Sequence, residues 1–241
     1  MPNWTELRHA YGSAEDLPEI LEELEPDPKA PVWGELWGRV CHQGTTYSAS
    51  MPVLPFLLSA ASSWEPAGRA MPLALAGSIV SAPESVSAGY EASLEGLRLL
   101  ALDTAKARGL SSSDRVHVMQ SALAFAGDRL WGHILDHLND GEFPGLCPAC
   151  RVDLNFVIGQ YGFFCAEGDW VRNPETPRTE IHPRENEKLD GVARWLYGVC
   201  AESGDSLVGE WVRYLFGVST CPNCGQPLEV ATAVAELEAT P

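Results

Sequence analysis

The chain has 241 residues, of which 45% are hydrophobic, so it can bury the core of one large or two small domains and does not have the composition of a disordered protein. Its formal net charge is −17 at pH 7. That charge creates a field that repels the phosphate backbone of nucleic acids and attracts cationic partners.

The sequence also lacks the features of a membrane-bound or secreted protein. Its two longest apolar stretches, residues 51–61 and 70–80, fall short of the roughly 20 residues that a spanning helix needs. The start, MPNWTELRHAYGS, has no basic segment followed by an apolar run, so no secretory signal is predicted. We therefore expect a cytoplasmic protein. Thiols stay reduced in that compartment, so paired Cys-x-x-Cys motifs indicate metal ligands before disulfides.

Acidic side chains are concentrated in the first forty residues, where nine acids stand against three bases. The acids are Glu6, Glu15, Asp16, Glu19, Glu22, Glu23, Glu25, Asp27 and Glu35, and the bases are Arg8, Lys29 and Arg39. One interpretation is that they keep the protein soluble. The other is that they form a docking surface for a basic partner.

Apolar residues recur at helical spacing through the first 140 residues, with almost no strand signal. A first helix is predicted over residues 17–24, with Ser13 placed to cap it, and a second from Pro31 to Cys41, ended by Gly44. Further helices are predicted over residues 50–61, 68–81, 88–108 and 113–139, with breaks at Pro66, Pro83, Gly109 and Gly141. The fold class is therefore mainly α, either an α-solenoid or, since no strict repeat is visible, a non-repetitive helical bundle.

Several short motifs in this half carry a resemblance to a known family. They are Tyr11-Gly12-Ser13-Ala14-Glu15-Asp16-Leu17-Pro18, the segment from Trp33 to Trp37, His42-Gln43-Gly44-Thr45, the segment from Tyr47 to Ser50, and Pro55-Phe56-Leu57. Over residues 4–140 the chain resembles the opening of bacterial HEAT-like repeat proteins. The resemblance implies a scaffold of helical hairpins used for binding and supplies no catalytic residues. The cysteine-rich end of the chain lies outside it.

The pattern changes after Gly145. Residues 152–158 and 163–166 flank a glycine-rich turn and predict a β-hairpin. Residues 167–185 are polar and proline-containing, so a loop is predicted there, followed by helices over 187–202 and 206–216. We therefore expect a HEAT-like helical domain over residues 1–143 and a zinc-binding module with a helical insertion over residues 144–241.

Four of the seven cysteines, Cys147, Cys150, Cys221 and Cys224, form two Cys-Pro-x-Cys motifs. Two residues between cysteines let one turn present both thiolates to the same ion, and two such turns complete the tetrahedral shell of zinc. The motifs resemble the paired knuckles of a zinc ribbon, and Gly225 would permit the unusual backbone angle after the second. We therefore predict structural Zn²⁺ bound by these four residues.

The spacing of the two motifs departs from that of a compact zinc ribbon. They are separated by 70 residues (151–220), whereas about 15 to 20 are usual, so a helical pair should interrupt the ribbon. One alternative is a redox-active site, which should open a helix within a βαβ pattern. The other is catalytic zinc, which needs a coordination position that four thiolates do not leave open.

The weaker candidates each have a structural interpretation. Cys41, Cys165 and Cys200 lie in apolar surroundings, which favours buried small hydrophobic residues over reactive thiols. His133 and His137, with Asp136 beside the latter, could face one metal from a helix, but the glutamate of a zincin motif is absent and a surface helix is favoured. The polar group His42, Gln43, Thr45 and Tyr47 is interpreted as a turn after the second helix, although such loops often serve function.

These observations favour a protein-binding adaptor or an inhibitor-like scaffold, stabilised by zinc, with another protein of basic character as its partner rather than a nucleic acid or a membrane. The first alternative is an accessory biosynthetic enzyme with its site in the helical concavity or one that uses His42, His133 and His137. The second alternative is a nucleic-acid-binding HEAT-like protein, since HEAT-like DNA glycosylases exist. It would require a basic stripe, and the bases near the cysteine motifs are scattered.

Overall fold

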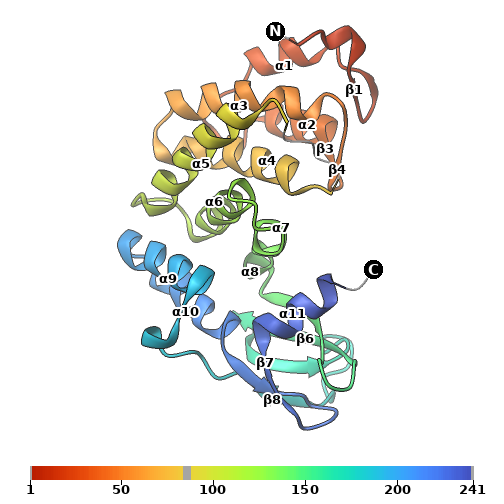
Figure 1. Cartoon of the computed structure of the whole chain (residues 1–241), viewed down its shortest axis with the longest axis vertical. Coiled ribbons are helices and arrows are strands. Elements are labelled where there is room, and N and C mark those ends of the chain that lie inside the picture. The colour runs from red at the N-terminus through yellow and green to blue at the C-terminus, as the bar shows by residue number, and fades with distance from the viewer. Residues whose placement is uncertain (1, 84–87, 240–241) are drawn as a thin grey trace. The chain divides into compact units, whose positions relative to one another are not determined.

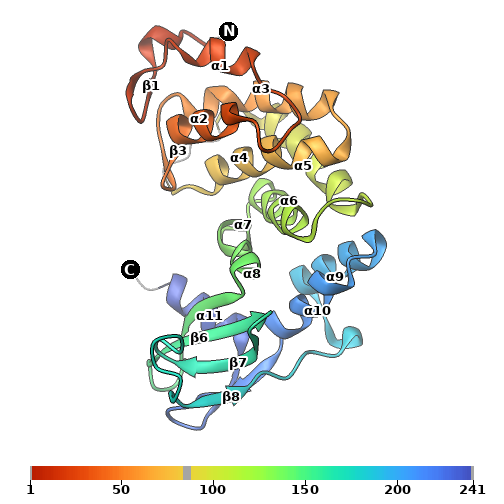
Figure 2. The same cartoon turned by 180° about the vertical axis from the view of Figure 1, so that it is seen from behind.

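The computed structural model describes residues 2–83 and 88–239 (Figures 1 and 2). These residues are 52% helical, with 11 α-helices and four small antiparallel sheets, so the fold combines α and β structure. The chain divides into two compact units, Met1–Leu135 and Asp136–Pro241. Of the helices described, none combines the length and the apolar character that a membrane span requires.

Seven of the described α-helices belong to the first unit. They are α1 (Leu17–Glu22), α2 (Pro31–Val40), α3 (Ser50–Ser63), α4 (Ala70–Ser81), α5 (Glu91–Lys106), α6 (Ser112–Phe125) and α7 (Trp131–Ile134). Short 3-10 turns cover Trp4–Glu6 and Pro66–Arg69. The five helices predicted from residue 17 to residue 108 are all present, with ends within a few residues of the expected ones.

The helices of the first unit pack as successive pairs. α3 packs against α4, and α5 packs against α6; α3 also contacts α5, and α4 also contacts α6. α2 likewise contacts both α1 and α4. Gly77 lets α4 approach α6 closely, because a Cβ at this position would lie 2.5 Å from the Ser121 hydroxyl oxygen. Leu73 and Met119, fully buried on these two helices, belong to the core between them.

The prediction of one long helix over residues 113–139 is wrong, because this segment forms three separate helices, α6, α7 and α8 (His137–Asp140). α6 ends where Gly127 adopts a positive φ of 83°. The next turn begins at Asp128, whose carboxylate accepts a hydrogen bond of 2.9 Å from the backbone N–H of Trp131. The apolar period continues through this segment, but the Gly-Asp pair stops one helix and caps the next.

Two short hairpins in the first unit were not predicted. β1 (Arg8–His9) pairs with β2 (Gly12–Ser13), and β3 (Cys41–His42) pairs with β4 (Thr45–Thr46). Helix α2 therefore ends before Gly44, which instead forms a two-residue hairpin turn with Gln43, both at positive φ. Ser13 lies in β2 and does not cap α1; Asp16 occupies that position.

The second unit is built on a four-stranded antiparallel sheet whose strands lie in sequence order. They are β5 (Glu142–Leu146), β6 (Asp153–Gly159), β7 (Gly162–Glu167) and β8 (Arg178–Glu180). The predicted hairpin is thus present as β6 and β7. The other two strands of this sheet were missed, since β5 contains Pro144 and Gly145 and β8 lies inside the segment predicted as a loop.

Besides α8, the remaining described elements of this unit are a 3-10 turn (Asn186–Lys188), α9 (Gly191–Ser203), α10 (Ser206–Leu215), the hairpin of β9 (Val218–Thr220) and β10 (Pro227–Glu229), and α11 (Val230–Glu238). The helical pair α9 and α10 was predicted, whereas the β9–β10 hairpin and α11 were not. α11 packs on β5. The contact is close at Gly145, where a Cβ would lie 2.9 Å from the carbonyl oxygen of Ala233.

A backbone bridge connects the small β9–β10 hairpin to the segment that follows β8. The N–H of His182 donates to the carbonyl of Val218 at 2.8 Å, and the N–H of Val218 donates back at 3.0 Å. The side-chain oxygens of Thr179 and Ser219, one on each sheet, lie 3.2 Å apart. The second Cys-x-x-Cys motif is thereby held beside the main sheet.

Candidate metal centre

Each Cys-x-x-Cys motif lies at the tip of an antiparallel hairpin. The last pair of β5 and β6 is Leu146 with Asp153, and the first motif occupies the residues between them. The corresponding pair of β9 and β10 is Thr220 with Pro227, and the second motif lies between these two. In both hairpins, therefore, the first cysteine of the motif directly follows the last paired residue of the first strand.

The backbones of the two knuckles also follow the same path. The N–H of Cys147 donates to the carbonyl of Val152 at 3.0 Å, and that of Cys221 donates to Gln226 at 2.8 Å. After each second cysteine the chain turns through a left-handed residue, Arg151 with φ 62° and Gly225 with φ 73°. The angle expected at Gly225 is confirmed, and the first knuckle adopts it without a glycine.

The four thiols predicted from the sequence converge on one point. All their sulfur atoms lie within 4.8 Å of one another. Cys147 lies 3.8 Å from Cys224, and Cys150 lies 3.8 Å from Cys221, measured between Sγ atoms. A tetrahedron with zinc–sulfur bonds of about 2.3 Å has sulfur–sulfur edges of about 3.8 Å. The four residues could therefore hold a metal ion.

Burial and hydrogen bonding differ between the first and second cysteine of each knuckle. Cys147 and Cys221 are buried, whereas Cys150 and Cys224 are exposed. The backbone N–H of Val152 lowers the pKa of the Cys150 thiol to about 7, and burial raises the pKa of Cys221 to about 12. A divalent cation would have to displace the protons of this cluster, so its affinity should rise with pH.

The arrangement differs from that of a redox-active Cys-x-x-Cys site. The two sulfur contacts of 3.8 Å join cysteines of different knuckles. Each motif also connects two antiparallel strands, whereas a thioredoxin-like motif opens a helix after a strand. Four thiolates at tetrahedral corners leave no position for water or substrate, so a metal held here would be structural.

The other three cysteines, Cys41, Cys165 and Cys200, are all buried, as predicted. Burial raises the pKa of Cys165 to about 12, which keeps this thiol protonated at neutral pH. Such thiols act as small hydrophobic side chains and not as nucleophiles. Within the described part of the chain, the four-cysteine group is the one cluster of three or more His, Cys, Asp or Glu residues with metal-ligand spacing.

The predicted histidine pair does not share a helix. His133 is exposed on α7, whereas His137 begins α8 and its ring lies 5.6 Å from that of Phe143. A spacing of four places two side chains on one face only within a continuous helix, and here the helix is interrupted. None of the three residues His133, Asp136 and His137 belongs to the group of four cysteines that could hold a metal ion.

The polar group after α2 forms the β3–β4 hairpin. His42 lies in β3 with its ring centroid 5.7 Å from that of Tyr11, and Gln43 occupies the turn at φ 49°. Thr45 lies in β4, and the backbone N–H of Tyr47 donates to the hydroxyl of Ser50 at 2.8 Å. These residues shape the chain between two helices.

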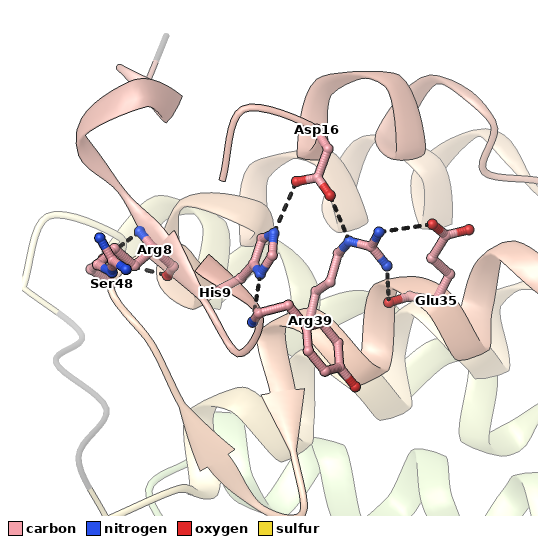
Figure 3. Close-up of polar contacts among 7 residues, drawn as sticks. Arg8, His9, Asp16, Glu35, Arg39 and Ser48 are labelled. Atoms are coloured by element: carbon pink, nitrogen blue, oxygen red, sulfur yellow. Dashed lines mark hydrogen bonds and ion pairs between the residues drawn. The ribbon is translucent and has the colours of Figure 1, made fainter. Parts of the chain in front are cut away.

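A second polar cluster, which the sequence did not reveal, lies near the N-terminus (Figure 3). The Nε2 atom of His9 is 2.9 Å from one carboxylate oxygen of Asp16, and Nε of Arg39 is 2.8 Å from the other. Arg39 also forms an ion pair of 3.0 Å with Glu35, one turn earlier on α2. No sequence motif predicts this cluster, because its members come from three separate elements.

This cluster fixes the N-terminal hairpin on the helices. The backbone N–H of Tyr11 donates to Nδ1 of His9 at 3.0 Å, so a neutral His9 carries its proton on Nε2 and donates it to Asp16. Both ring nitrogens are thus engaged, and the imidazole is buried. Arg8 adds a backbone bond of 2.9 Å to the hydroxyl of Ser48 (Figure 3). The geometry is that of an anchor and not of a general base.

The Asp16 carboxylate should make stability depend on pH. Burial raises its pKa, but hydrogen bonds from Arg39 and His9 outweigh this effect and hold the pKa below its usual value. A depressed pKa stabilises the fold above the unfolded value of about 3.9, and this contribution is lost as pH falls through the folded value. We therefore expect Asp16→Asn to cost about 1 kcal/mol at pH 7 and progressively less below pH ~4.

Urea unfolding of the wild type and Asp16→Asn at a series of pH values measures this difference. Glu19→Gln is the matched control, because Glu19 is an exposed carboxylate in the first turn of α1 with no ion pair among the described contacts. A free-energy difference for Asp16→Asn that stays constant from neutral to acid pH would contradict the assignment.

Comparisons with known proteins add no relative to this description. No family model, curated protein or solved structure matches the chain. The metal-ligand assignment therefore depends on the geometry of Cys147, Cys150, Cys221 and Cys224 themselves.

Proposed function

We propose that this chain is a protein-binding scaffold whose C-terminal unit is stabilised by a structural zinc ion. The observation that carries the metal assignment is the convergence of four thiols from two Cys-x-x-Cys motifs, one in each hairpin, that are separated by 70 residues in the sequence (151–220). Zinc is the metal favoured by a tetrahedral set of four cysteines, and a site closed by four thiolates serves structure.

The zinc would stabilise the unit by joining two segments that are distant in the sequence. One knuckle belongs to the main sheet, and the other follows α10 and precedes α11. A bond between them closes a loop that contains β6, β7, β8 and the pair α9–α10, and closing a long loop reduces the entropy of the unfolded chain. Zinc binding contributes folding energy directly in such sites.

The binding role is supported by the packing and the charge of the first unit. Stacked helical pairs, with α3 beside α5 and α4 beside α6, are compatible with a HEAT-like scaffold. Eight of the nine acids in the first forty residues are exposed. An acidic surface on such a scaffold attracts a basic protein and increases its rate of association. An adaptor or an inhibitor of a basic protein, acting in the cytoplasm where thiols stay reduced, fits these features.

Affinity capture from a native lysate with chemical crosslinking tests the binding role. We expect one reproducible basic protein, retained at low ionic strength and released as salt screens the charges. Mobility-shift titration with duplex DNA at ~0.15 M salt should show no complex, because screening does not make an acidic surface attractive to phosphate. Failure to recover any reproducible partner would count against the binding role, and a DNA shift with steep salt dependence would favour the nucleic-acid alternative.

A further inference from the structure

A groove with a volume of about 270 Å³ lies in the first unit. One wall is helix α3, and the other is the end of α1 with the residues that directly follow it. Its apolar lining comes from Leu21, Leu24, Phe56, Ala60 and Trp64. The hydroxyl-bearing residues Ser59 and Ser63 complete it. Phe56, Ala60 and Trp64 follow one another at intervals of four, so they form one face of α3 and its end.

Aromatic contacts hold the walls of this groove in place. The ring of Trp64 packs edge-on against Trp33, with centroids 6.0 Å apart, and Phe56 lies 5.9 Å from Trp4. Trp33 is buried, and its Nε1 donates to the carbonyl of Glu25 at 3.1 Å, which fixes the chain just after α1. The groove is thus built from side chains that have fixed partners.

Carboxylates accompany the lining residues along the chain. The lining residues Leu21 and Leu24 are flanked in the sequence by three exposed glutamates, Glu22, Glu23 and Glu25. Glu65, also exposed, follows Trp64. The nearby cation Arg69 is engaged, since its Nε donates to the Trp64 carbonyl at 2.7 Å and its Nη1 pairs with Asp103 at 2.9 Å.

We infer that this groove is the docking site for a cationic amphipathic segment of a partner protein. An apolar side chain of that segment would occupy the space between Leu24, Phe56 and Trp64. Its lysines or arginines would pair with the exposed glutamates that adjoin the lining residues in the chain. This chemistry follows the helix-in-groove mode of peptide recognition, with charge supplying orientation. The inference rests on the proposed binding role and specifies the chemistry of the partner.

Fluorescence anisotropy with a labelled synthetic peptide tests the inference on the full chain. The probe is a helical peptide with leucine at one face and lysine at the others. One control peptide replaces every lysine with glutamate, and a second replaces every leucine with serine. We expect both controls to bind at least about tenfold more weakly than the probe, because each lacks one half of the recognition.

Two matched pairs of variants locate the site. Ser59→Trp fills the groove, whereas Ser62→Trp adds the same side chain at an exposed position of α3 outside the lining. The first should weaken probe binding about tenfold and the second should leave it within about twofold. Changing Glu22, Glu23 and Glu25 to lysine should likewise weaken binding about tenfold, and far more than the same change at the exposed residues Glu175, Glu187 and Glu238.

Thermal unfolding of each variant confirms that it is folded before binding is compared. Equal affinity of Ser59→Trp and Ser62→Trp, or of the two triple variants, would overturn the groove as the site. The same variants in the lysate capture separate this inference from the binding role. If wild type and Ser59→Trp retain the same partner equally, the binding role is supported and the groove is excluded as its site. If the probe binds in the groove but no partner is captured, the groove is supported as a peptide site and the binding role is contradicted.

Discussion

Replacing Cys147 or Cys224 with serine is expected to remove the metal and to loosen the whole second unit. Serine offers a neutral hydroxyl where zinc requires a soft thiolate, so the site should lose most of its affinity. Structural zinc sites contribute about 10 to 16 kcal/mol of apparent binding free energy at neutral pH, more than the stability of most small domains. The first unit has its own core and should remain folded.

Metal content per chain, paired with limited proteolysis, measures this outcome. Wild type should carry one zinc ion per chain, and the two serine variants should lack it and be cleaved in the second unit. Cys165→Ala and Cys200→Ala are the matched controls, since both cysteines are buried outside the ligand group; each should keep the zinc and cost only about 1 to 2 kcal/mol. Undiminished zinc in Cys147→Ser or Cys224→Ser would sink the assignment.

Replacing Arg115 with alanine is expected to destabilise the first unit by about 3 to 5 kcal/mol, since it removes several hydrogen bonds from a charged donor. Arg115 is only 2% exposed, and its guanidinium reaches the end of the neighbouring helix α5. It donates to the carbonyls of Ala105 and Ala107, the latter at 3.1 Å, and to that of Leu110 at 3.4 Å. A cation at a helix C-terminus also interacts favourably with the helix dipole.

Urea unfolding compares this variant with two others. Arg115→Lys keeps the charge, but a single ammonium group lacks the planar fork that reaches all three carbonyls, so an intermediate loss is expected. Arg129→Ala removes an exposed arginine of the same unit and should change stability by less than about 0.5 kcal/mol. A loss below about 1 kcal/mol for Arg115→Ala would show that the carbonyls find other donors.

Features that depend on short stretches of sequence were predictable. The helices from residue 17 to residue 108 follow from apolar spacing and from Pro31 and Gly109, signals that act within a few turns. The four candidate metal ligands follow from the spacing within each Cys-x-x-Cys motif, which sets the turn geometry locally. The β6–β7 hairpin was visible for the same reason, because its two strands are adjacent and joined by a glycine-rich turn.

Features that join distant segments needed the tertiary structure. Strand β8 has only three residues, and it exists because β7 offers it an edge. Helix α11 is stabilised where it packs on β5, and the cluster of His9, Asp16 and Arg39 brings together three elements. A local sequence pattern does not predict which distant segment an element will pack against, because the free energy of these contacts depends on which surfaces folding brings together.

The candidate site shows the same division. The sequence by itself determined the identity of the four thiols, since Cys-Pro-x-Cys presents both donors within one turn. Only the tertiary structure decided that knuckles 70 residues apart (151–220) meet with sulfur atoms 3.8 Å apart, because this distance depends on the pairing of β9 with β10 and on the bridge between His182 and Val218. The groove beside α3 likewise exists only once α1 lies next to that helix, since neither element alone encloses a volume.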